Sequence, residues 1–198
     1  MKRLGSIAVA TGVLLLTACS IHLDPRVSKR SGAPRQGTVG ASTTATGMPQ
    51  RVGWGTFTVF AIPIAPVSIS NGPGERIVMD KVKETLTTAG YQVVDAGPSR
   101  TTPRLECDVK RFAFRNYTWL VPIVFTWGKV ELDLRLVGGE GSELWKRSYT
   151  GSNFNLAYSF SMAANRSMEQ ILDHVAQDVA SDEFFHACCQ EPPAVVAP

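Results

Sequence analysis

Residues 129–136 read Lys-Val-Glu-Leu-Asp-Leu-Arg-Leu, with an apolar side chain at every second position and a charged one between. Because successive residues of a β-strand face opposite sides of the sheet, this alternation predicts a strand with one buried face and one wet face. The buried face needs a covering layer, so helices are expected on that side of the sheet.

Further strands are expected on both sides of this one. Residues 104–117 alternate in the same way at first, and the apolar phase then shifts by one residue, which predicts a bulge near Arg111. The glycine-rich residues 138–141 predict a hairpin turn. Five strands are expected in all, at residues 56–62, 91–94, 104–117, 129–136 and 143–150.

Two stretches have the spacing of amphipathic helices. Residues 75–89 are followed by Gly90, the usual residue after a helix C-terminus, and a second helix is expected from about 161 to 185. The order β-α-β-β-β-β-α predicts an α+β fold, in which two helices pack on one face of a mostly antiparallel sheet. The expected buried stripes are Val78, Val82 and Leu86 in the first helix and Met168, Ile171, Leu172, Val175 and Val179 in the second.

The first 18 residues have the features of a signal peptide for export. Two basic residues precede an apolar run at 7–16, which is shorter than the roughly 20 residues that span a bilayer. Residues 16–19, Leu-Thr-Ala-Cys, resemble the lipobox of bacterial lipoproteins. That resemblance implies cleavage after Ala18 and attachment of acyl chains such as palmitate to Cys19, because a thiolate is the nucleophile that takes up the lipid. The alternative is an ordinary cleaved signal with a cysteine at this position by chance.

The lipid anchor predicts a location and a domain division. In lipoproteins of enteric-type bacteria, a residue other than aspartate after the cysteine, here Ser20, resembles the pattern sent to the periplasmic face of the outer membrane; retention in the inner membrane is the alternative. Residues 19–53 show no clear hydrophobic period, so a disordered basic tether with a reach of roughly 30 Å is expected. The globular domain is expected at 54–188 and a flexible tail at 189–198.

Charge and composition exclude one class of function. The 198 residues have a formal net charge of +3, and 44% of them are hydrophobic, which is enough for a packed core. The basic excess lies in the N-terminal part, and residues 52–198 contain more acidic than basic side chains. A nucleic-acid-binding body has the opposite arrangement, so no nucleic acid partner is expected. The basic tether is expected to be a soluble spacer or to contact anionic headgroups.

Signals for catalysis or metal binding are weak. His174 precedes Asp178 by four residues, and Asp182 precedes His186 by four, so each pair can meet on a helix face, as ordinary solvated pairs also do. Residues 186–189, His-Ala-Cys-Cys, are the densest group of ligand types, but zinc needs about four ligands. We therefore expect no catalytic residues, no metal and no cofactor. Cysteines of exported proteins often form disulfides. Two alternatives are therefore expected: a disulfide between Cys107 and either Cys188 or Cys189, or free thiols at these positions.

An uncharged segment is the candidate contact surface. Residues 117–127 read Tyr-Thr-Trp-Leu-Val-Pro-Ile-Val-Phe-Thr-Trp, and proline is excluded from the middle of a sheet. The aromatic side chains either belong to the core or form an exposed surface that meets a membrane or a protein partner. The candidate contact residues are Trp119, Leu120, Ile123, Phe125 and Trp127.

Several architectural features resemble the YajG-like group of small envelope lipoproteins. They are the helix end at 88–93, the alternating strands at 104–117 and 129–137, the Tyr-Thr-Gly-Ser sequence at 149–152 and the terminal amphipathic helix. The resemblance implies no catalytic residues.

We predict a non-enzymatic adaptor or assembly factor of the cell envelope, with an envelope protein as partner. One alternative is an accessory lipoprotein of a transport system, with a cavity for lipid or another apolar ligand between sheet and helices. The other is a hydrolase or metal protein that uses His174, His186 and the terminal cysteines.

Overall fold

The computed structural model describes most of the chain after the predicted signal peptide. The described residues are 20–28, 35–57, 62–95, 102–120, 123–139, 141–156 and 159–189. The signal peptide, the predicted lipid attachment at Cys19, Pro122 and the tail from residue 190 lie outside them.

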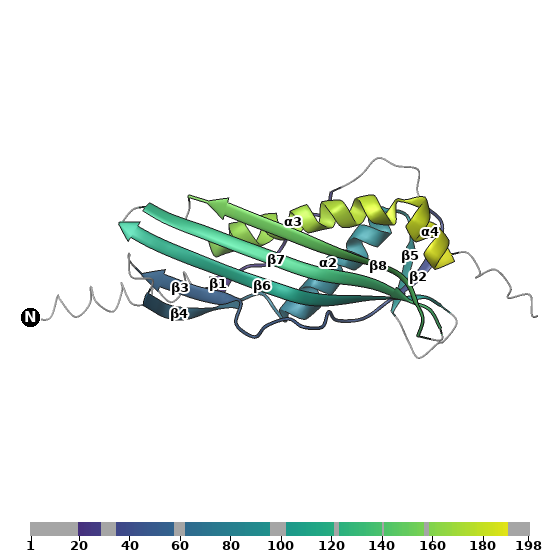
Figure 1. The fold of residues 1–198 in the computed structure, drawn as a ribbon, viewed down its shortest axis with the longest axis horizontal. Helices are drawn as coiled ribbons and strands as arrows, with labels where there is room; N and C mark the ends of the chain where they lie inside the picture. The colour runs from purple at the N-terminus through teal and green to yellow at the C-terminus, as the bar shows by residue number, and fades with distance from the viewer. Residues whose placement is uncertain are drawn as a thin grey trace, which may run out of the picture.

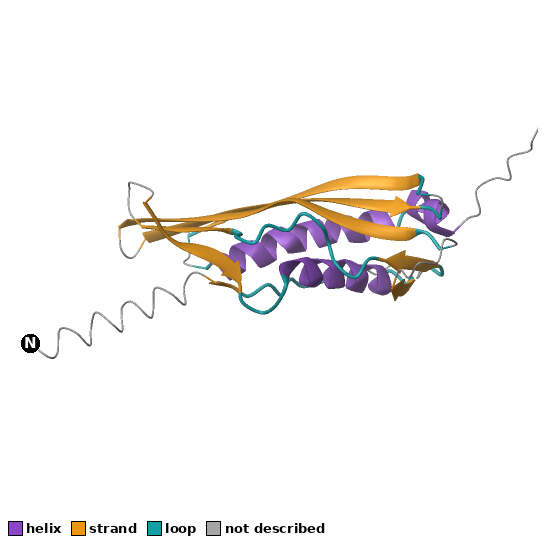
Figure 2. Ribbon diagram, turned by 90° about the horizontal axis from the view of Figure 1, so that it is seen from below, coloured by secondary structure: helices purple, strands orange, loops and turns teal. Residues whose placement is uncertain are grey.

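Three long strands form the centre of the sheet, and helices cover one of its faces. Strands β6 (Arg104–Leu120), β7 (Ile123–Val137) and β8 (Glu143–Asn155) are antiparallel neighbours (Figure 1). Figure 2 shows the two long helices, α2 (Gly74–Thr88) and α3 (Phe160–Val179), beneath the same face. The predicted α+β fold is confirmed, and so is the bulge, which lies between Val109 and Arg111.

Five short strands complete the sheet. Two short strands pair in parallel with the edge of β6 that faces away from β7. Strand β2 (Thr38–Ala41) pairs with the start of β6, and β3 (Gly53–Phe57) pairs with the end of β6. Strand β2 also pairs with β5 (Gln92–Asp95). Strand β4 (Ile62–Ile69) pairs with β3 and with β1 (Ser20–Ile21). The single strand predicted at 56–62 was therefore wrong, because this apolar stretch divides between two antiparallel strands, β3 and β4.

The helices bury the predicted stripes. All eight side chains named for the two helices are buried, and they pack on the inward-facing residues of β6 and β7. The second helix is shorter than expected, because it ends at Val179 and α4 (Asp182–Cys189) follows after a turn. The hydroxyl of Ser181 accepts a hydrogen bond from the backbone N–H of Phe184 at 3.2 Å and so caps α4.

The prediction of a disordered tether at 19–53 was wrong for its described residues. Ile21, Leu23 and Pro25 are buried and Val27 is half-buried, whereas the residues between them are exposed. This alternation with a period of two buries one side of residues 20–28 in the core. Residues 38–41 likewise form β2, and β3 begins at Gly53, so described residues of this range belong to the folded body from Ser20 onward.

Residues 22–28, which we call the N-terminal strap, follow helix α3. The backbone N–H groups of His22 and Asp24 donate to the side chains of Ser161 and Asn165, at 2.8 and 2.9 Å. The N–H of Arg26 donates to Glu169 in the same way, at 3.2 Å. Two residues of an extended chain advance about 6.6 Å, and four residues of a helix advance about 6.0 Å. Every second strap residue therefore lies beside every fourth residue of α3, where the polar partners are. The helix therefore supplies the partners that a sheet would give this segment.

Candidate functional site

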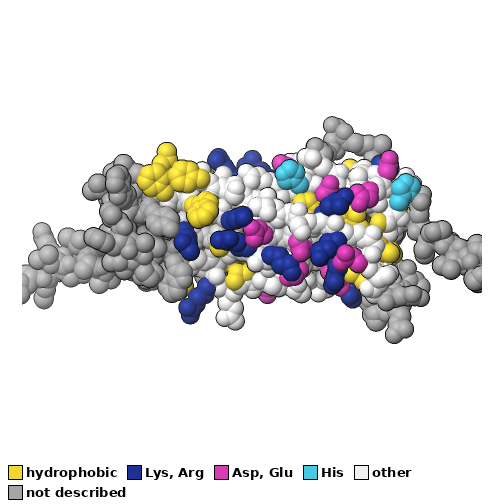
Figure 3. Space-filling view, in the orientation of Figure 1, with side chains coloured by type: hydrophobic (Ala, Val, Ile, Leu, Met, Phe, Trp, Pro, Cys, Tyr) yellow, Lys and Arg dark blue, Asp and Glu magenta, His cyan; other side chains and the backbone are white. Residues whose placement is uncertain are grey.

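Four apolar side chains group on the helix-free face of the sheet, at the end where β7 begins and β8 finishes. Trp127, Phe154 and Leu156 are 44%, 62% and 71% exposed, and Phe125 is half-buried. The rings of Phe125 and Phe154 stack with their centroids 5.8 Å apart. We call these four residues the end patch, and Figure 3 shows hydrophobic side chains gathered at this end of the molecule.

The strand alternation explains why the end patch faces outward. Thr126 and Gly128 on β7 are buried, so Phe125 and Trp127 face the opposite side. Phe154 pairs with Trp127 across the β7–β8 register. Sequence reasoning missed Phe154 and Leu156, because their alternation with asparagine looks like a buried strand face. The register between β7 and β8 decides which side chains of β8 face outward, and the sequence does not show this register.

The structure brings together two of the five predicted contact residues. Phe125 and Trp127 belong to the end patch. The backbone of Trp119, Leu120 and Ile123 lies at the same end of the sheet, where Leu120 pairs with Ile123, and their side chains lie outside the described part. A contact surface formed by all five therefore stays a prediction.

Charge is distributed unevenly around the end patch. Trp127, Arg115, Trp54 and Pro66 pair in one row across β7, β6, β3 and β4. Every strand residue described beyond this row, toward the end of the sheet, is uncharged. These residues are 55–57, 62–65, 116–120, 123–126 and 155. We call this part of the sheet, together with the end patch, the charge-free end.

The chain enters the fold at the charge-free end. Ser20 pairs with Ser68, two residues along β4 from Pro66. Strand β1 runs parallel to β4 and leads away from the end of the sheet. Cys19 precedes Ser20 by one peptide bond, which is about 3.8 Å between Cα atoms. The predicted site of lipidation is therefore within a few ångströms of a fixed strand.

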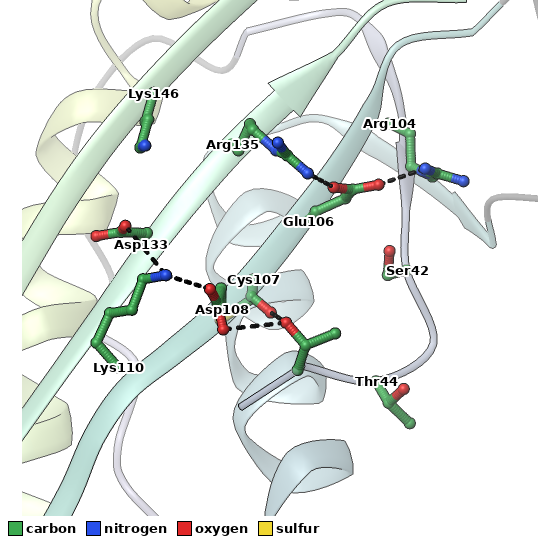
Figure 4. Close-up of a pocket in the computed structure, with 11 residues that line it drawn as sticks. Ser42, Thr44, Arg104, Glu106, Cys107, Asp108, Lys110, Asp133, Arg135 and Lys146 are labelled. Carbon is green, nitrogen blue, oxygen red and sulfur yellow. Dashed lines mark hydrogen bonds and ion pairs between the residues drawn. The ribbon is translucent and has the colours of Figure 1, made fainter. Parts of the chain in front are cut away.

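The opposite half of the same face carries a polar groove of about 380 Å³ (Figure 4). Arg135 donates to Glu106 at 2.6 Å, and Arg104 pairs with the same carboxylate. Burial raises the pKa of Glu106, but the hydrogen bonds from Arg135 and Arg104 outweigh it, so its pKa lies below the ordinary value. The lining residues are Ser42, Thr44, Thr46, Arg104, Glu106, Cys107, Asp108, Lys110, Asp133, Arg135 and Lys146.

A second set of ion pairs occupies the middle of the groove. Lys110 pairs with Asp108 and, at 3.9 Å, with Asp133. The hydrogen bond from Lys110 lowers the pKa of Asp108, and Thr46 donates a further bond to it at 3.1 Å. Lys146 is exposed and has no ion-pair partner among the described residues. The acidic side chains that line the groove are thus paired with arginine or lysine, and Lys146 is available to an acidic group of a partner.

The three described cysteines are free thiols. Cys107 is buried on β6, and Cys188 is buried on α4 beside the half-buried Cys189. The disulfide considered for Cys107 is therefore not present in the structure. Burial raises the pKa of the Cys107 thiol to about 12, with Asp108 and Asp133 adding to the shift. A buried thiol with so high a pKa is a poor nucleophile.

The two helix histidines do not assemble a site among the described residues. His174 and His186 are both exposed. The carboxylate of Asp178 accepts from the Tyr149 hydroxyl at 2.8 Å, and Asp182 pairs with Arg35 at 2.7 Å. Within the described ranges, no group of three or more His, Cys, Asp or Glu side chains is placed to hold a metal ion.

A second described pocket, of about 180 Å³, lies between the turn before α2 and residues 48–52. Neither described pocket lies between the sheet and the helices, where an apolar ligand would bind. No helix in the described part of the chain is long and apolar enough to cross a bilayer.

A known structure shares this architecture, whereas no family model matches the sequence and no curated protein does. A DUF330 protein from Xanthomonas campestris aligns over 81% of this chain and 91% of its own, with a TM-score of 0.53 and 15% identity. The two chains share a fold. At this identity the likeness shows the fold alone.

Two further structures align less closely. A hemagglutinin homologue from Helicobacter pylori covers 84% of this chain and 98% of its own, with a TM-score of 0.47 and 10% identity. A lipoprotein from Neisseria meningitidis covers 73% and 98%, with a TM-score of 0.38 and 12% identity. Their TM-scores are below 0.5, so we draw no conclusion from them.

Proposed function

We propose that the protein is a lipid-anchored, non-enzymatic adaptor of the bacterial cell envelope. In this proposal Cys19 carries the lipid on the periplasmic face of the outer membrane, and the polar groove receives a protein partner. The supporting observation is that the chain enters at one end of the sheet and the groove lies toward the other. Trp127 and Arg135 are eight residues apart on β7, which corresponds to roughly 26 Å along a strand. An anchor at one end would thus present the groove away from the membrane.

The chemistry of the groove suits a protein surface more than catalysis. Its carboxylates are paired with arginine or lysine, and its one described thiol is buried. Lys146 is available to an acidic side chain of a partner. Charged groups of this kind set orientation and association rate more than raw affinity.

The anchor is tested by replacing the lipidated residue. We expect the wild-type protein to fractionate with outer membranes, to require detergent for release and to have the mass of an acylated chain. Cys19→Ala should abolish acylation, and its intact mass should show no acyl chains. Cys189→Ala is the matched control and should fractionate like the wild type. An unacylated mass for the wild type, or an acylated mass for the Cys19→Ala protein, would contradict the anchor.

The partner site is tested by photocrosslinking in cells. A photoreactive residue at the exposed position Ser148, beside Lys146 and hydrogen-bonded to Asp133, should give a discrete crosslinked band. Lys146→Glu should weaken that band strongly, because it reverses the available charge. The same photoreactive residue at Arg76, exposed on α2, is the control and should give no such band. A Ser148 band that is insensitive to Lys146→Glu would overturn the assignment of the groove.

A further inference from the structure

We infer that the charge-free end lies in the interface of the lipid bilayer that holds Cys19, with anionic headgroups against Arg115 and Lys129. The inference rests on the lipid attachment of the proposed function and adds a second membrane contact made by the folded body. That contact would fix how the body is oriented on the membrane.

The first argument is position. Cys19 precedes Ser20, and Ser20 is only two residues along β4 from the row that contains Trp127. Strands β1 and β7 are separated by four strand spacings in the order β1-β4-β3-β6-β7, which is roughly 20 Å across the sheet. Ser20, the residue after the predicted lipidation site, and the end patch are therefore at nearly the same level of the sheet. Because β1 is part of the fold, the body cannot move far from the membrane that the lipid enters.

The second argument is the type of residue at this end. Trp127, Phe154 and Leu156 expose apolar surface to solvent. Tryptophan is enriched where a membrane meets water, because its ring is apolar and its N–H is polar. The described strand residues beyond the row of Trp127 are uncharged, so no charge would have to leave water when this end enters the interface. Exposed apolar groups rimmed by polar residues are typical of membrane or protein contacts.

The third argument is the charge beside the end patch. Arg115 is exposed and pairs with Trp127 across the β6–β7 register. Lys129 follows Trp127 by two residues on the same face and pairs with Glu131 at 2.5 Å. Basic side chains close to a membrane surface are attracted to anionic lipid. Figure 3 shows Lys and Arg beside the hydrophobic group, and acidic side chains mostly farther toward the other end.

The fourth argument separates a membrane from a second copy of the chain. Binding of another copy to the end patch would be bimolecular. The membrane is joined to this end through Cys19, so its contact is intramolecular and has a high effective concentration. The bilayer is therefore the occupant that the fold favours.

The test uses lipidated protein in vesicles of phosphatidylcholine and phosphatidylglycerol with brominated acyl chains. Bromine quenches tryptophan emission on contact, so the wild type should lose emission relative to vesicles without bromine. Phe154→Asp should abolish most of this quenching, because a charge then enters the end patch. Leu144→Asp is the matched control, because Leu144 is 40% exposed on the same strand and face at the other end. It should be quenched like the wild type.

Arg115→Glu tests the headgroup contact. It should reduce quenching in vesicles with phosphatidylglycerol and have a smaller effect in phosphatidylcholine alone. Intact mass confirms acylation of every sample, so a failed anchor is distinguished from a failed membrane contact. Equal quenching of the Phe154→Asp and Leu144→Asp proteins would overturn the inference. A second outcome would also overturn the inference. If the wild type is a dimer in detergent, and Phe154→Asp makes it a monomer without changing the quenching, a second copy occupies the end patch.

Discussion

Burial controls the reactivity of the cysteines. Cys107 and Cys188 are buried, on β6 and α4 respectively, and burial raises the pKa of both thiols. Cys189 is only half-buried and packs against Gly37, where a side chain on the glycine would collide with the sulfur. Three thiols of one chain therefore differ in access to solvent.

We expect a thiol reagent at pH 8 to modify Cys189 first and Cys107 very slowly in the native protein. The thiolate is the reacting species, and a pKa of about 12 leaves almost none of it at Cys107. Mass spectrometry of digested, time-quenched samples measures the order. In denaturant without reductant all three should react, and fewer than three would reveal a disulfide that the structure lacks.

The end patch shows which residues of a site sequence can find. Phe125 and Trp127 were predicted because an uncharged aromatic run around a proline is unusual. Phe154 and Leu156 were not predicted. The register between β7 and β8 decides which side of β8 faces outward, and the sequence does not show this register. The fixed position of Ser20, which decides how the end patch lies relative to Cys19, was missed for a similar reason. Its partner strand β4 is nearly fifty residues away.

At the scale of elements, the N-terminal strap is the clearest addition to the fold. It lies along α3, and Asp24 also pairs with Lys81 of α2 at 3.1 Å. Its inward side chains join the core that β6 and the helices form. The strap therefore contributes to the stability of the fold.

Leu23→Ala should destabilise the fold by about 2–4 kcal/mol, because it leaves a cavity under a fully buried side chain. Arg26→Ala is the control, because this side chain is exposed, and should change stability little. Urea unfolding followed by circular dichroism gives both values. Identical midpoints for Leu23→Ala and the wild type would show that the segment is a free tether after all.

Regular elements could be predicted and irregular ones could not. Strands β6, β7 and β8 and helices α2 and α3 have long, unbroken periods, so their type was clear from sequence. Strands β2 and β3 are short and rich in glycine, and they exist because the edge of β6 offers them partners. The break before α4 did have a local signal, since Ser181 followed by Asp182 and Glu183 is a typical helix start.

The whole molecule is polarised along its sheet. The charge-free end and the chain entry lie at one end, and the polar groove lies toward the other. A lipid on Cys19, as proposed, would need no hinge to the folded body, because β1 begins one residue after Cys19.

Inserting about ten flexible Gly and Ser residues between Cys19 and Ser20, with serine first, should leave the unfolding midpoint unchanged and reduce quenching by brominated lipid. A flexible spacer of this length has a root-mean-square reach of roughly 17 Å and so lowers the effective concentration of the membrane at the end patch. The same insertion at the exposed Gly141 turn between β7 and β8 is the control and should keep the quenching. Unchanged quenching in the spacer protein would mean that the end patch binds the bilayer without help from the lipid.

The strap also reverses the order of assembly relative to the order of synthesis. Its hydrogen bonds to α3 join residues 139 to 143 positions apart. Residues 20–28 leave the ribosome early, yet they cannot take their final place until α3 has followed. Contacts of such long range also slow folding, since a large loop must close first. If Cys19 is lipidated before α3 has been made, as a modification of a growing chain would require, the lipid joins a chain whose first strand is still unformed.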